Sequence, residues 1–171
     1  MEVIMDIKLL VTYDPAHESA CKQSVTNAIS AVGASPTFLK SKYNGIFLID
    51  VVKPKEVIKK LKKLCEKDKD IFGRTHRYIP VDRWVASKVA DMQSAVKSLV
   101  PEIGKNQKWK MELDKRYYHK MSYDDLIIKL TDVVDREKID LKKPEKIIKV
   151  EVIGSNAAIS VLNPDEQLAV S

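Results

Sequence analysis

The chain is poor in the residues that most catalytic sites need. It has only five glycines in 171 residues, and each stands alone in the sequence. Clustered glycines let backbone amides surround a phosphate, so no nucleotide-binding or cofactor-binding loop is expected. The three histidines are scattered and no Cys-x-x-Cys pair is present, which leaves no metal-ligand pattern. These absences predict a non-enzymatic chain with no catalytic residue, metal site, cofactor or small-molecule substrate.

Cysteine and long apolar runs are also scarce. The two cysteines, Cys21 and Cys65, indicate a reducing compartment. The longest apolar runs, such as Ile46–Ile49, have the length of a strand and are far too short for a membrane helix. The first residues, MEVIMDIKLLVTYD, carry acids and lack the basic region of a signal peptide. We therefore expect a cytoplasmic protein with no membrane partner.

Positive charge is in moderate excess. Lys and Arg number 30 against 24 Asp and Glu, which gives a net charge of +6 and a pI near 9.1. A basic balance is consistent with a polyanionic partner, but the placement of the charges says more than their sum.

Residues 1–81 show the order strand, helix, strand, strand, helix, strand. Ile7, Leu9 and Val11 alternate as an opening strand, and Asp14 followed by Pro15 is typical of a helix start. The remaining expected elements are a helix ending near Gly33, strands over 36–42 and 46–52 around an Asn-Gly turn, a helix from Pro54, and a strand over 74–81. This order predicts a ferredoxin-like βαββαβ domain, in which Cys21 and Cys65 serve as small core residues rather than as a redox pair.

Residues 82–171 predict a second domain of α/β type. An apolar stripe from Val85 to Leu99 predicts a helix that ends before Pro101. Trp109, Met111 and Leu113 then alternate as one face of a strand. A helix capped by Ser122 follows, with Asp124 and Asp125 as cap and dipole partners, and two strands over 147–153 and 157–162 complete the domain. The whole chain is therefore expected to be of the α+β class.

Three groups of basic residues stand out. The helix from Pro54 carries many lysines opposite its apolar stripe, which we interpret mainly as a solvated face. The other two groups combine arginines with nearby aromatic residues, a pattern that suits phosphate binding and base stacking. We therefore predict RNA contacts at the join between the domains and around the strand that begins at Trp109. The candidate residues are Arg74, Arg77, Arg83, Lys108, Lys110, Lys115, Arg116, His119 and Lys120.

Two stretches of the second domain resemble the THUMP family. The run Ile139–Gly154, IDLKKPEKIIKVEVIG, is similar to the closing signature of THUMP domains: an apolar-Asp-Leu-x-x-Pro turn, an I-x-V-E-V strand and a hairpin. The run Leu113–Ile127, LDKRYYHKMSYDDLI, is similar to the basic strand end and capped helix of the family. Many THUMP domains have a pair of basic residues followed by glycine. In this chain the basic pair is Lys115 and Arg116, and the residue that follows is Tyr117.

The resemblance implies a function in tRNA modification. THUMP proteins bind tRNA, and a small ferredoxin-like domain commonly precedes the THUMP domain. With Arg77–Asp82 in the join, the chain resembles the Tan1-type proteins, which are non-catalytic adaptors. The implied partners are tRNA and an RNA acetyltransferase of another chain, which would form acetylcytidine on the tRNA presented to it.

Two other functions of the chain remain possible from the sequence. The chain could be the RNA-binding subunit of a different split enzyme, one that thiolates or methylates tRNA. Alternatively, ferredoxin-like domains also serve as regulatory or dimerisation modules that bind no RNA, and the fold alone does not decide between these functions.

Overall fold

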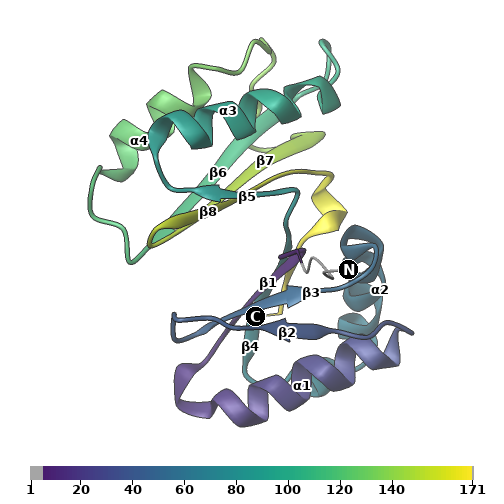
Figure 1. Cartoon of the computed structure of the whole chain (residues 1–171). Helices are drawn as coiled ribbons and strands as arrows, with labels where there is room; N and C mark the ends of the chain where they lie inside the picture. Colours follow the sequence, from purple (N-terminus) through teal and green to yellow (C-terminus); the bar gives the residue numbers. More distant parts are fainter. Residues whose placement is uncertain (1–5, 171) are drawn as a thin grey trace, which may run out of the picture. The chain divides into compact units, whose positions relative to one another are not determined.

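The computed structural model describes residues 6–170, which form two compact units. Unit 1 comprises the residues up to Val81 together with those from Asp165 onward, and unit 2 runs from Asp82 to Pro164. Each unit has a sheet with helices packed on one of its faces (Figure 1). The mixed α and β class expected from the sequence is confirmed.

Unit 1 is built on an antiparallel sheet with the strand order β2-β3-β1-β4-β9. Up to β4, its regular elements follow the order βαββαβ that the sequence predicts, with short 3-10 turns at Pro15–His17 and Lys69–Phe72. The elements are β1 (Leu9–Tyr13), α1 (Glu18–Ala31), β2 (Thr37–Leu39), β3 (Ile46–Asp50), α2 (Pro54–Lys67), β4 (Thr75–Pro80) and β9 (Leu168–Ala169).

The core of unit 1 lies between this sheet and helices α1 and α2. Cys21 is a buried member of that core and Cys65 packs against it from α2, so both act as small apolar residues. Burial raises the pKa of the Cys21 thiol, which keeps it protonated near neutral pH. The strand expected over 36–42 pairs with β3 only through Thr37–Leu39, because the chain then leaves the sheet for the loop that contains Asn44 and Gly45.

Unit 2 is built on a four-stranded sheet with the order β5-β8-β7-β6. Strands β6 and β7 are parallel and the other pairs are antiparallel. Helices α3 and α4 cover the same face of this sheet and enclose the core of the unit. The elements are β5 (Arg83–Ala86), α3 (Val89–Leu99), β6 (Trp109–Arg116), α4 (Tyr123–Thr131), β7 (Lys146–Ile153) and β8 (Asn156–Leu162), with a 3-10 turn at Val100–Glu102. A further 3-10 turn, Pro164–Glu166, spans the boundary between unit 2 and the last part of unit 1.

The apolar stripe that begins at Val85 is shared by two elements. Val85 lies in β5, opposite Ala157 of β8, and α3 begins only at Val89. Ser87 holds the chain out of the helix, because its backbone N–H donates to the Ser155 carbonyl at 2.9 Å and its hydroxyl to the Gly154 carbonyl at 2.7 Å. The prediction that the helix includes Val85 is therefore wrong.

The end of the chain belongs to unit 1, whereas we expected the second domain to extend from 82 to 171. Strand β9 pairs antiparallel with β4, with Leu168 opposite Tyr78. The Val170 N–H donates to the His76 carbonyl at 2.7 Å, and Lys59 of α2 lies 3.7 Å from the Glu166 carboxylate. Leu168 and Val170 are both buried in the unit 1 core. Burial of these apolar side chains favours the pairing of β9 with β4.

Replacement of Leu168 by Ala should destabilise unit 1. Leu168 is only 6% exposed, so we expect a loss of roughly 2–3 kcal/mol in unfolding free energy, from lost burial and from the cavity left behind. Urea unfolding combined with hydrogen exchange of β4 amides measures the effect. The exposed neighbour Ala169 provides the control, because Ala169→Ser should change stability by less than about 0.5 kcal/mol. Faster exchange confined to unit 2 would contradict the placement of β9.

Candidate nucleic-acid interface

Strand β6 is a buried strand that ends in basic residues, as the sequence predicts. Trp109, Met111 and Leu113 point toward the helices and are buried in the unit 2 core. The strand pairs with β7 along its whole length, up to Arg116 opposite Ile153, and the Gly154 N–H then donates to the Arg116 carbonyl at 2.9 Å. The basic end of β6 is therefore part of the sheet and has a defined backbone position.

The face of β6 opposite the helices carries an ionic row. The Lys110 ammonium lies 2.8 Å from the Glu112 carboxylate, which also accepts from the Lys149 ammonium of β7 at 3.1 Å. Lys149 is buried, with Asp114 and Glu151 carboxylates at 4.0 and 3.8 Å. These carboxylates give the buried Lys149 charge the partners that it needs, and they link β6 to β7. The ion pair with Glu112 leaves Lys110 with less capacity to neutralise a phosphate.

Lys108 takes part in an ion pair and hydrogen bonds at the start of β6. Its ammonium lies 3.7 Å from the Asp140 carboxylate, and its backbone N–H donates to the Glu145 side chain at 3.1 Å. The Asp140 carboxylate accepts the backbone N–H groups of Lys143 and Lys142 at 3.0 and 2.9 Å, and these bonds lower the pKa of Asp140. The Asp-Leu-x-x-Pro stretch thus forms a turn that holds the strand in place.

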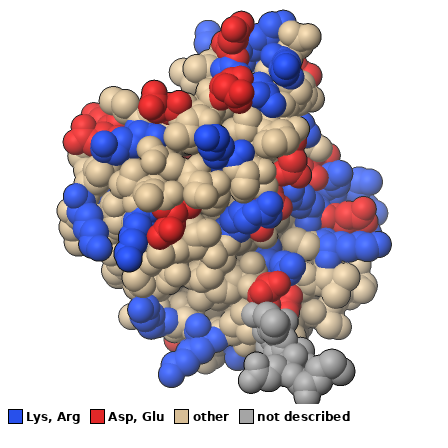
Figure 2. All heavy atoms as spheres, turned by 45° about the horizontal axis from the view of Figure 1, so that its top comes forward, with Lys and Arg blue, Asp and Glu red and all other residues tan. Residues whose placement is uncertain are grey.

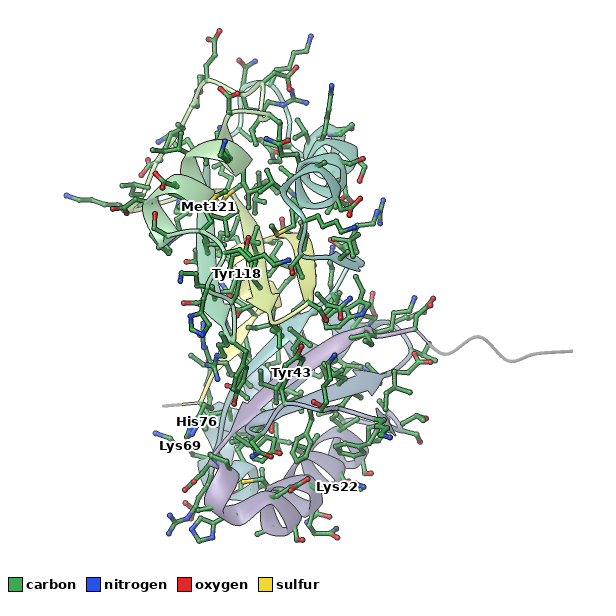
Figure 3. The ribbon with its side chains drawn as sticks, turned by 60° about the vertical axis from the view of Figure 1, so that its left-hand side comes forward. Lys22, Tyr43, Lys69, His76, Tyr118 and Met121 are labelled. Atoms are coloured by element: carbon green, nitrogen blue, oxygen red, sulfur yellow. The ribbon has the colours of Figure 1, made fainter. Side chains whose placement is uncertain are left out.

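The loop after β6 is anchored on the helix side of the sheet. Tyr118 is buried in the unit 2 core, and its carbonyl accepts from the Lys115 ammonium at 3.4 Å. Figure 3 shows Tyr118 and Met121 on this loop, ahead of α4. Ser122 caps the start of helix α4: its hydroxyl accepts the Asp125 N–H at 3.2 Å, so the predicted cap is confirmed.

Three basic side chains at this end of β6 have no ion-pair or hydrogen-bond partner among residues 6–170: those of Arg116, His119 and Lys120. His119 and Lys120 are exposed, and Arg116 is half-buried. Successive strand residues point to opposite faces, so Arg116 lies on the side of Glu112 and Asp114, whereas Lys115 lies on the helix side. These three are the candidates best placed to bind an anion.

The candidates at the join belong to different units. Arg74 and Arg77 are in unit 1, and Arg83 is the first residue of β5 in unit 2. The Arg74 guanidinium lies 3.6 Å from the Asp14 carboxylate, and Arg77 is a half-buried residue of β4. Arg83 is exposed, and its guanidinium donates to the neighbouring Asp82 carbonyl at 3.1 Å. Whether these arginines bind the same RNA as the end of β6 stays a prediction.

Sequence reasoning missed the importance of Arg136. Its guanidinium donates to the carbonyls of Ile103 and Val100, at 2.7 and 3.2 Å, and to the Asp135 carboxylate at 2.8 Å. Its own carbonyl accepts from the Trp109 indole at 3.1 Å. Arg136 therefore ties the turn after α3 to the start of β6, and it is held by protein groups. Its position after α4, in a stretch without a periodic pattern, gave no signal of this role.

Acidic side chains lie among the basic ones on the face seen in Figure 2, which has no continuous basic area. Contacts with a polyanion on such a surface depend on particular side chains more than on a broad positive field. Among residues 6–170, no group of three or more His, Cys, Asp or Glu side chains is placed to hold a metal ion. No helix within that range combines the length and apolar character needed to cross a bilayer.

Comparison with protein families matches the model of the THUMP domain to residues 86–162. That range contains the end of β6, the Asp140 turn and the β7–β8 hairpin. Residues 86–162 form a THUMP domain. The resemblance noted in the sequence is confirmed for this domain, and a search of curated proteins found no match to the chain.

Solved structures with a similar fold include three proteins of low sequence identity. PH1313 of Pyrococcus horikoshii Ot3 is 12% identical with a TM-score of 0.64, and the match covers 91% of this chain and 54% of that protein. TrmN of Thermus thermophilus is 16% identical with a TM-score of 0.59, over 94% and 45% of the two chains. A protein of Listeria monocytogenes described as a predicted N6-adenine-specific DNA methylase is 10% identical with a TM-score of 0.56, over 91% and 40%. The chain thus spans about half the length of these proteins or less, and the likeness shows the fold.

The backbone after the basic pair follows the path that a glycine favours. Tyr117 has φ +55°, in the left-handed region, which is unfavourable for a side chain with a Cβ atom. THUMP domains with glycine at this position and the present chain can therefore share one local path.

Replacement of Tyr117 by Gly should raise the stability of the THUMP domain. Relief of the left-handed conformation outweighs the extra chain entropy of glycine, so we expect a gain of up to about 1 kcal/mol in unfolding free energy. Urea unfolding of wild type, Tyr117→Gly and Tyr117→Ala tests this. The alanine variant also loses the ring but keeps the unfavourable φ, so it should be less stable than the glycine variant. The reverse order would show that the positive φ carries no strain.

Proposed function

We propose that this chain is a non-catalytic tRNA-binding protein that acts in tRNA modification. The observation that carries the proposal is the basic end of β6, within a THUMP domain. There Arg116, His119 and Lys120 have no side-chain partner among residues 6–170; the pairing with β7 holds the backbone of Arg116, and His119 and Lys120 follow in the loop that Tyr118 anchors. Phosphate groups are the natural ligands of unpaired arginine and lysine side chains such as those of Arg116 and Lys120.

The proposal extends to the reaction. The similarity of the join, Arg77–Asp82, to that of Tan1-type proteins favours a role as adaptor for an RNA acetyltransferase of another chain, which forms acetylcytidine. In this role the chain orients tRNA and the partner supplies the chemistry. The isolated glycines and scattered histidines of the sequence support a role without catalysis by this chain.

Methylation is the second candidate reaction. One structure with a similar fold is described as a predicted methylase, and the chain covers 40% of that protein. A chain of this kind could therefore supply the RNA-binding part of a methyltransferase whose catalytic domain lies on another polypeptide.

Neutralising the end of β6 should weaken tRNA binding through lost phosphate contacts. In Arg116→Gln/Lys120→Gln, the slope of log affinity against log salt should fall by about 0.7–0.9 for each contact removed. The loss should be similar for different tRNAs, because phosphate contacts carry no sequence information. A salt titration of binding, measured by fluorescence anisotropy, gives both quantities.

The matched control removes the same charge from α2. Lys60 and Lys63 are exposed on the lysine-rich face that we interpret as solvated, so Lys60→Gln/Lys63→Gln should change the slope much less. If the α2 variant loses most of the affinity and the β6 variant binds like wild type, the interface lies on α2. If neither variant changes the binding of a wild type that does bind tRNA, the interface lies elsewhere.

The adaptor role is tested by reconstitution. The purified chain should form no acetylcytidine on tRNA with acetyl-CoA, but it should accelerate the reaction of an RNA acetyltransferase captured with it from native cells. Arg116→Gln/Lys120→Gln should reduce this stimulation. A captured partner that transfers methyl groups would favour the second candidate, and modification of tRNA by the pure chain alone would overturn the non-catalytic role.

A further inference from the structure

Tyr117 combines two unusual properties at the end of β6. Its backbone lies in the left-handed region with φ +55°, one of two such residues other than glycine in the part of the chain that the structure describes. Its side chain is 55% exposed, whereas the adjacent Tyr118 is 4% exposed. Tyr118 therefore packs the loop against the unit 2 core. At position 117, a large aromatic residue occupies a backbone conformation that favours glycine.

The two neighbours of Tyr117 are both anchored. On one side, the Arg116 carbonyl accepts the Gly154 N–H at 2.9 Å. On the other side, Tyr118 is buried and its carbonyl accepts from Lys115 at 3.4 Å. Tyr117 is therefore presented by a short segment with little freedom to move. Binding to such a side chain requires less ordering than binding to a residue of a mobile loop.

The chemistry next to Tyr117 is that of a nucleic-acid site. Arg116 precedes it, and the exposed His119 and Lys120 follow two and three residues later. An exposed aromatic ring beside cationic groups is the combination that binds single-stranded nucleic acid, because the cations contact phosphates while the ring stacks on a base. Bases inside a duplex are already stacked on both faces, so such a ring selects an unpaired nucleotide.

We propose that Tyr117 stacks on an unpaired base of the bound RNA. This inference rests on the proposed RNA-binding function and adds a ligand class to it: RNA with an unpaired nucleotide next to the phosphates held by Arg116 and Lys120. The strained backbone at Tyr117 then has a functional reason, because strain of this kind is retained where a side chain must be placed for binding.

The experiment compares wild type with Tyr117→Phe, Tyr117→Ala and Tyr117→Gly. Two probes are used, a short single-stranded oligoribonucleotide and a blunt RNA duplex of the same length. Loss of the ring should raise the Kd for the single strand by about 5- to 150-fold, as for one stacked base, and change the Kd for the duplex little. Tyr117→Phe keeps the ring and should bind the single strand like wild type.

Two further measurements separate stacking from a structural role. The fluorescence of an aminopurine base in the single strand should be quenched by wild type and by Tyr117→Phe, but not by the alanine and glycine variants. Tyr117→Gly should also melt at a higher temperature than Tyr117→Ala while binding the single strand equally weakly. A merely structural residue would lose affinity and stability together.

The outcomes distinguish this inference from the function on which it rests. If wild type binds the single strand and Tyr117→Ala binds it equally well, the stacking inference is wrong and RNA binding stands. An equal loss on the single strand and the duplex would also overturn stacking, because it would indicate a general disruption of the surface. If wild type binds neither tRNA nor these probes, the proposed function fails, and the inference fails with it.

Discussion

The parallel pairing of β6 with β7 is the constraint on which the rest of the THUMP domain depends. Eight residues of each strand are paired from Trp109–Lys146 to Arg116–Ile153. Side chains secure this pairing on both faces of the sheet: Trp109, Met111 and Leu113 lie in the core, and Lys149 bridges carboxylates of both strands. Because successive residues alternate between faces, the register also determines which side of the sheet each basic residue at the strand end occupies.

The sequence predicts those structural features that are determined by residues close together in the chain. The alternation of Trp109, Met111 and Leu113 and the cap at Ser122 are determined within a few residues, and both are found in the structure. Val85 and Leu168 were misplaced because their partners, Ala157 and Tyr78, are far away in the sequence. Periodicity shows that such residues are apolar, but it does not show which core they enter.

The region of the candidate site could be predicted from the sequence. Which of its basic side chains lack a protein partner could not. Basic residues near β6 were found from composition and spacing, whereas the ion pairs of Lys108 with Asp140 and of Lys110 with Glu112 depend on tertiary contacts. The conformation of Tyr117 likewise depends on its anchored neighbours, since tyrosine has no intrinsic preference for a positive φ. The residues at the end of β6 differ from the other basic candidates in their ion pairing and in the backbone conformation at Tyr117, and neither property can be read from the number of charges.

The return of β9 to unit 1 affects the order in which the chain can fold on the ribosome. Leu168 and Val170 emerge after every residue of the THUMP domain, yet they complete a core to which residues from Leu9 onward contribute. The THUMP domain is a continuous segment and can fold as soon as it has been synthesised. Unit 1 begins first but closes its sheet last, so its edge at β4 stays unpaired throughout synthesis of the THUMP domain and is open to non-native strand pairing during that interval.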